Sequence, residues 1–98
     1  MKVLIESQFV LTDTQKKHIE KTMEGLTDLE HRITQAEIYF KKGDGNSTKE
    51  VSCKIRVHIP GNDVVISDSD EDRMKAFNDA FQRTKRQLIK EKKARRPY

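Results

Sequence analysis

The sequence predicts an α+β domain with the element order β-α-β-β-β-α, in which two helices pack on one face of a four-stranded sheet. Apolar and polar residues alternate over residues 51–59, which is typical of a half-buried strand. Apolar residues recur at helical spacing from Ile19 to Leu26 and from Met74 to Leu88, which indicates two amphipathic helices. The chain has 98 residues, which fit one domain and leave little room for an enclosed active site.

The first two elements are a strand and a helix. Residues 2–8 alternate between apolar and polar side chains, so the chain is expected to open with a strand. Thr12 or Asp13 then offers an N-cap for a helix that should end by about Leu29. The apolar residues on the inner face of this helix are Ile19, Met23 and Leu26.

Three further strands follow, separated by turns. Residues 36–42 alternate in the same way, and residues 43–47 are rich in Gly, Asp and Asn and predict a turn. Residues 51–59 form the clearest strand, which we expect in an antiparallel sheet. Pro60-Gly61-Asn62 predicts a tight turn, and residues 63–67 supply the partner strand.

A long helix completes the domain. Residues 69–72 have the Ser-x-x-acid form of a capping box, so we expect the helix to begin there. Its inner face carries Met74, Phe77, Ala80, Phe81, Thr84 and Leu88. The apolar stripe stops after Glu91, which predicts a folded domain over residues 1–91 and a flexible basic tail over residues 92–98.

The residue types that carry chemistry are not arranged as a catalytic or metal site. The single cysteine, Cys53, cannot form an internal disulfide and is expected to be a buried, reduced thiol. The three histidines are scattered without metal-ligand spacing. Asp68, Asp70 and Asp72 imitate the start of a calcium loop, but Arg73 stands where that loop needs glycine. We therefore expect no enzyme, no cofactor, no metal and no small-molecule substrate.

Charge is distributed unevenly along the chain. From Arg73 onward, ten Lys or Arg accompany two acidic residues, which gives +8, whereas the preceding 72 residues carry −4. This imbalance favours a polyanionic partner, because counterions released from nucleic acid supply affinity that does not depend on base sequence. We find no segment of roughly 20 apolar residues that could span a bilayer and no signal peptide, so we expect a cytoplasmic protein without a membrane partner.

The candidate site is a basic surface. Lys41 and Lys42 close the second strand, the third strand projects two cations from its polar face, and the last helix supplies the rest. The candidate RNA-binding residues are Lys42, Lys54, Arg56, Lys75, Arg83, Lys85, Arg86, Lys90 and Lys93. Because we find no base-reading motif, we expect recognition of RNA shape and phosphate position. Phe77 and Phe81 are interpreted as core residues, not as stacking residues.

Several short motifs share an order and spacing with a known family. They are the turn Ile59-Pro60-Gly61-Asn62, the pair Glu71-Asp72 at the entry of the last helix, Ala76, and Arg86-Gln87-Leu88 near its end. In these motifs the sequence resembles the ribosome hibernation promoting factor family, also called the ribosome-associated inhibitor, sigma-54 modulation or S30EA-type family. The resemblance covers nearly the whole chain. The chain departs from the family pattern at Arg73, Met74 and Thr84.

This resemblance implies a fold similar to the double-stranded RNA-binding domain. It implies a partner, the small ribosomal subunit, whose ribosomal RNA would be bound in the channel for messenger and transfer RNA. Translation would then be blocked under stress or in stationary phase. The contacts implied by position are Lys54, Arg56, Arg83, Arg86 and Lys90. The chain resembles a short member without the additional C-terminal dimerisation domain, and we expect it to be a monomer when free.

Two other functions are left open by the sequence. One is a general double-stranded RNA-binding module, which should bind isolated duplexes about as well as ribosomes. The other is a sigma-54-linked transcription regulator that acts by protein interaction and should keep its partner at high salt.

Overall fold

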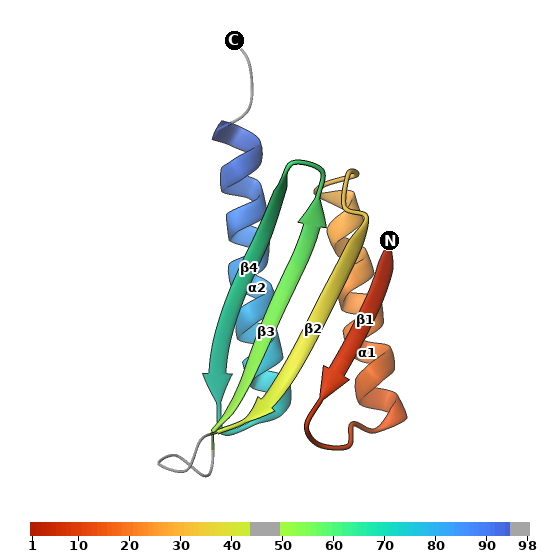
Figure 1. Cartoon of the computed structure of the whole chain (residues 1–98), viewed down its shortest axis with the longest axis vertical. Helices are drawn as coiled ribbons and strands as arrows, with labels where there is room; N and C mark the ends of the chain where they lie inside the picture. Colours follow the sequence, from red (N-terminus) through yellow and green to blue (C-terminus); the bar gives the residue numbers. More distant parts are fainter. Residues whose placement is uncertain (44–49, 95–98) are drawn as a thin grey trace.

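The computed structural model describes residues 1–43 and 50–94, and it confirms the predicted element order (Figure 1). Four strands form one mixed sheet in the order β1-β2-β3-β4. The helices and strands are β1 (Lys2–Ser7), α1 (Asp13–Glu24), the 3-10 turn η1 (Gly25–Asp28), β2 (Gln35–Lys42), β3 (Val51–Ile59), β4 (Asn62–Asp70) and α2 (Arg73–Ala94). Most of the turn predicted at residues 43–47 lies outside the described residues.

The sheet combines parallel and antiparallel pairing. β3 pairs antiparallel with both β2 and β4, as predicted for the central strand. β1 instead runs parallel to β2, with Val3 opposite Ala36 and Ile5 opposite Ile38. A parallel neighbour requires a crossover connection, and α1 with η1 supplies it.

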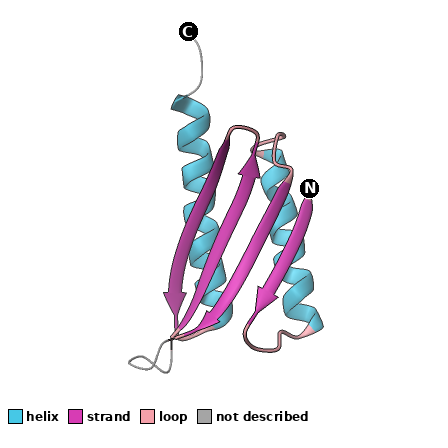
Figure 2. Cartoon of the chain, viewed as in Figure 1, coloured by secondary structure: helices cyan, strands magenta, loops and turns pink. Residues whose placement is uncertain are grey.

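Both helices lie on one face of the sheet and leave the other face open (Figure 2). In this view α2 lies behind β3 and β4, and α1 lies behind β1 and β2. The alternation of β3 decides which side chains enter the core between these layers, because successive residues point to opposite faces. On β3 the residues buried under the helices are Cys53, Ile55, Val57 and Ile59.

Helix α1 begins where the sequence predicts. Thr12 is the N-cap: its hydroxyl accepts the backbone N–H of Gln15 at 3.1 Å, and the Gln15 side chain accepts the N–H of Thr12 at 3.0 Å. This reciprocal pair satisfies two of the N–H groups that a helix start leaves without partners. Ile19, Met23 and Leu26 are fully buried, as expected for the inner face.

Helix α2 begins at Arg73, so the prediction of a start at residues 69–72 is wrong. Ser69 and Asp70 still belong to β4, which pairs with β3 through the last residues of both strands. The cap is Asp72, whose carboxylate accepts the backbone N–H of Met74 at 2.8 Å and whose carbonyl accepts that of Ala76 at 2.9 Å. Strand pairing therefore continues up to the cap, and the capping pattern of Ser69 is not used.

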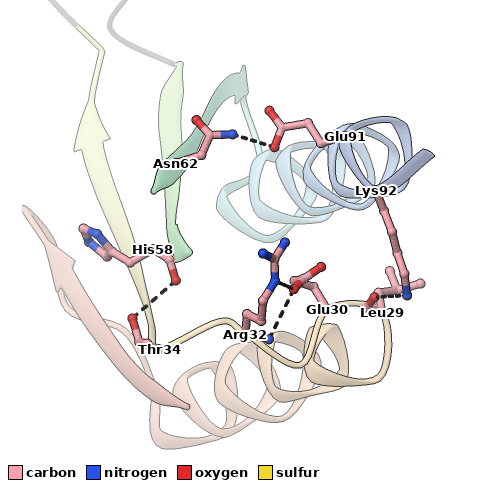
Figure 3. A network of polar contacts seen from close by, with 8 residues as sticks. All are labelled: Leu29, Glu30, Arg32, Thr34, His58, Asn62, Glu91 and Lys92. Carbon is pink, nitrogen blue, oxygen red and sulfur yellow. Dashed lines mark hydrogen bonds and ion pairs between the residues drawn. The ribbon is translucent and has the colours of Figure 1, made fainter. Parts of the chain in front are cut away.

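The last turn of α2 is held by two neighbouring segments (Figure 3). Asn62, at the turn between β3 and β4, donates to the carboxylate of Glu91 at 2.8 Å. The ammonium group of Lys92 donates to the carbonyl of Leu29 at 3.1 Å, just after η1. These contacts explain why the helix continues to Ala94 although its apolar stripe ends at Glu91. Residues 95–98 of the predicted tail lie outside the described residues.

Candidate nucleic-acid interface

Four of the candidate cations of α2 fall into two groups according to what they face. Lys75 and Arg83 face β4: the ammonium group of Lys75 lies 3.5 Å from Asp70, and the guanidinium of Arg83 lies 3.5 Å from Asp68. Arg83 also donates to the backbone carbonyl of Ser67 at 2.7 Å. The acidic residues of β4 therefore offset part of the positive charge that the helix carries.

Asp70 shows the effect of this pairing. The backbone N–H of Asp72 and the ammonium group of Lys75 lower the pKa of the Asp70 carboxyl below its usual value, so it stays charged. Lys75 is therefore a helix-to-strand contact as well as a surface cation, which the charge count could not show.

Arg86 and Lys90 form the second group and point to solvent. Both side chains are exposed. The guanidinium of Arg86 contacts only the carbonyl of Gln82 in its own helix, at 3.4 Å, among the contacts within the described residues. A shallow depression between α2 and β4 is lined by Ile66, Arg83, Arg86, Gln87 and Lys90. This arrangement leaves two cations available to an anionic partner.

Of the two remaining helix candidates, the structure describes the side chain of Lys85 only, and Lys85 does not line this depression. Lys85 is half-buried, and its ammonium group lies 5.9 Å from the centre of the Phe81 ring, so part of its side chain covers the core. The backbone of Lys93 lies in α2, but its side chain lies outside the described residues.

Lys54 and Arg56 lie on the open face of the sheet, as predicted. Strand alternation places Lys41 on this face and Lys42 on the helix side, at the end of β2. Lys42 is therefore not grouped with Lys54 and Arg56, whereas Lys41 is: all three line one hollow on the open face. The sequence named both lysines, and alternation along the strand already places them on opposite faces. The register of β2 against β3 then brings Lys41 opposite Ser52, beside Lys54.

The two basic areas meet at the edge of the sheet. Lys54 on β3 lies opposite Ser67 on β4, and Arg83 binds the carbonyl of that same Ser67. Cations therefore extend from the open face, past the edge strand β4, to the exposed side of α2. We call this surface the basic strip, and it consists of Lys41, Lys54, Arg56, Arg83, Arg86 and Lys90.

Four titratable residues form a network beside the basic strip on the open face. Glu37 accepts from the hydroxyl of Tyr39 and pairs with Nε2 of His58, whose Nδ1 lies 3.3 Å from Asp63. The hydrogen bonds from Tyr39 and His58 lower the pKa of Glu37. Glu37, followed by the charge of Asp63, raises the pKa of His58 above its usual value. The network therefore favours protonated His58.

We predict that Glu37→Gln lowers the pKa of His58 toward the ordinary histidine value, because the main partner of the imidazolium is lost. Since folding raises this pKa, the pairing stabilises the fold fully below the ordinary histidine pKa, and this contribution disappears as pH rises through the pKa of folded His58. Titration of the His58 ring signals by NMR measures the change. Asp63→Asn should lower the pKa less, and an unchanged pKa in Glu37→Gln would contradict the pairing.

Neither the thiol nor a metal-ligand group adds a site within the part of the chain that the structure describes. Cys53 is fully buried and free, as predicted, and burial together with Asp68 raises the pKa of its thiol to about 12. No group of His, Cys, Asp and Glu able to hold a metal ion occurs within residues 1–43 and 50–94. Within the same residues, no helix is both long and apolar enough to cross a membrane.

Comparisons with a family model and with solved structures both find proteins that are similar to this chain. The family model described as "Sigma 54 modulation protein / S30EA ribosomal protein" matches residues 5–96. A ribosomal subunit interface protein from Coxiella burnetii is similar in structure, with a TM-score of 0.82, 17% identity, and coverage of 94% of this chain and 98% of that chain. The N-terminal domain of Protein Y from Thermus thermophilus is also similar, with a TM-score of 0.76, 23% identity, and coverage of 92% and 98%. A search of curated proteins finds no match.

Proposed function

The chain belongs to the sigma 54 modulation protein / S30EA ribosomal protein family, and from this premise we propose that it binds the small ribosomal subunit through ribosomal RNA. Members of this family are non-enzymatic, ribosome-associated factors. By lying in the channel for messenger and transfer RNA, the protein inhibits translation under stress or in stationary phase. Such a role takes place in the cytoplasm and requires no cofactor.

The observation that carries this proposal is the basic strip. It presents cations from β2, β3 and α2 on one continuous surface, and within the described residues Arg86 and Lys90 have no carboxylate partner. Guanidinium and ammonium groups spaced along a rigid helix suit the phosphates of a folded RNA. The folded domain then occupies the channel and sterically excludes messenger and transfer RNA from it.

Sedimentation with ribosomes at low and raised salt tests the proposal. The protein should pellet with small subunits at low salt. If all six cations of the basic strip contact phosphate, affinity should fall by about a thousandfold between roughly 50 and 200 mM salt. A wild-type protein that stays in the supernatant at low salt would show that ribosomal RNA is not its partner.

The family description also favours a second candidate, a transcription regulator that acts by protein contact. It predicts binding to polymerase components that survives high salt, because a packed protein interface depends less on counterions than an RNA contact. The third possibility is a general double-stranded RNA-binding module. Binding to isolated RNA duplexes distinguishes it from a ribosome-specific factor, since such a module would bind duplexes about as well as it binds ribosomes.

A further inference from the structure

A hollow on the open face of the sheet combines features of a nucleotide site. Three adjacent strands contribute to it, and the register brings Tyr39 opposite Lys54 and Lys41 opposite Ser52. The residues that line it are Tyr39, Lys41, Ser52, Lys54, Arg56 and Ser67. It therefore holds cations that suit a phosphate, hydroxyl groups that suit a ribose and one aromatic ring.

The acid opposite Arg56 in the sheet is shared with two other side chains. Glu37 lies directly opposite Arg56 in the register of β2 and β3. Its two carboxylate oxygens, however, are occupied by the Tyr39 hydroxyl and the His58 ring. Within the described residues the buried Nε of Arg56 has no hydrogen-bond partner. Because this Nε is buried, an incoming phosphate oxygen would be bound by the terminal nitrogens of the guanidinium.

The ring of Tyr39 is held in place beside these cations. Its hydroxyl reaches back along β2 to Glu37, so the side chain leans along the strand and does not rotate freely. The ammonium group of Lys54 lies 5.8 Å from the centre of the ring. A partly exposed aromatic ring on the polar face of a sheet is a surface on which an unstacked base can lie.

We propose that this hollow binds a single-stranded segment of RNA, with a base stacked on Tyr39 and an adjoining phosphate held by Lys41, Lys54 and Arg56. The inference rests on the proposed function and assigns a different RNA form to each part of the basic strip. The exposed cations of α2 suit the phosphates of a duplex. A duplex cannot supply the hollow with a base, because its bases are stacked inside the helix.

Binding of a labelled oligouridine and of a blunt RNA duplex, followed by fluorescence anisotropy, tests this assignment. Tyr39→Ala should weaken oligouridine binding by about 5- to 100-fold and leave duplex binding within about twofold. Tyr39→Phe keeps the ring and should retain oligouridine binding within about threefold. Lys54→Gln should weaken oligouridine binding and flatten its salt dependence. Thermal melting confirms that each variant is folded, and Tyr39→Leu replaces the alanine variant if that fails to fold.

Equal effects of Tyr39→Ala on both RNAs, or no effect on either, would overturn the inference. Displacement of labelled oligouridine from the wild type by oligoglutamate as effectively as by unlabelled oligouridine would also overturn it, because the hollow would then recognise charge alone. Ribosome sedimentation separates this result from the proposed function. If the wild type pellets with small subunits but Tyr39→Ala binds oligouridine as tightly as the wild type does, only the inference fails. If the wild type does not pellet, the proposed function fails.

Discussion

Arg86→Glu/Lys90→Glu is expected to abolish sedimentation with small ribosomal subunits at salt concentrations where the wild type pellets. The two side chains are exposed on α2 and, within the described residues, pair with no carboxylate, so reversing them removes phosphate contacts without breaking an internal ion pair. The loss of affinity should be at least about a hundredfold at low salt. The slope of log affinity against log salt in a milder Arg86→Gln/Lys90→Gln variant should fall by about 2.

Lys16→Glu/Lys17→Glu provides the matched control. Both lysines are exposed on α1, away from the basic strip, and the substitution changes the net charge by the same amount. The control should pellet nearly as well as the wild type if location decides binding. Equal losses in the two double variants would mean that overall charge, and not the basic strip, carries the affinity.

Phe77→Ala is expected to lower the free energy of unfolding by about 3–5 kcal/mol. Phe77 is fully buried, and its ring lies 6.3 Å from the His18 ring on α1 and 6.1 Å from the Phe81 ring on α2. Removing it opens a cavity where α1 and α2 meet over the sheet. Because a domain of this size has a total stability of roughly 5–15 kcal/mol, the variant should melt more than about 10 °C below the wild type.

Ile89→Ala on the same helix is the control for this substitution. Its side chain is 38% exposed, so truncation leaves little cavity and should cost less than about 1 kcal/mol. Urea unfolding followed by circular dichroism measures both variants. Equal losses for Phe77→Ala and Ile89→Ala would contradict the assignment of Phe77 to the core between the two helices.

The prediction for Phe77 could be made from the sequence alone, whereas the choice of Arg86 and Lys90 needs the structure. Phe77 was assigned to the core from helical spacing alone, and the structure confirms it. Arg86 and Lys90 were also named from the sequence, but so was Arg83, which the structure pairs with Asp68. Reversing Arg83 would disturb the contact of α2 with β4, so only the structure identifies a clean variant. Contact of these cations with RNA stays a prediction.

The side-chain contacts on the open face of the sheet could not be predicted from the sequence. Alternation placed Tyr39 and Glu37 on the polar side of β2, and His58 on the polar side of β3. Nothing in the spacing of these residues shows that His58 and Tyr39 share Glu37, because the alternation within each strand does not fix the register between them. Tyr39 was therefore absent from the predicted site, and Lys41 was named with the basic surface but not among the candidate RNA-binding residues. The signal in the sequence that could have identified Tyr39 is an aromatic residue at a polar-face position of its strand.

The element order and the buried side of each element could be predicted from the sequence, because they depend on the period of apolar residues. The sequence offered Thr12 or Asp13 as the N-cap of α1, and the structure selects Thr12. The parallel pairing of β1 with β2 and the continuation of β4 to Asp70 became visible only in the folded chain. The tertiary structure also decided which cations are paired. Pairing depends on distances between segments far apart in the chain, and packing of α2 against β4 sets those distances.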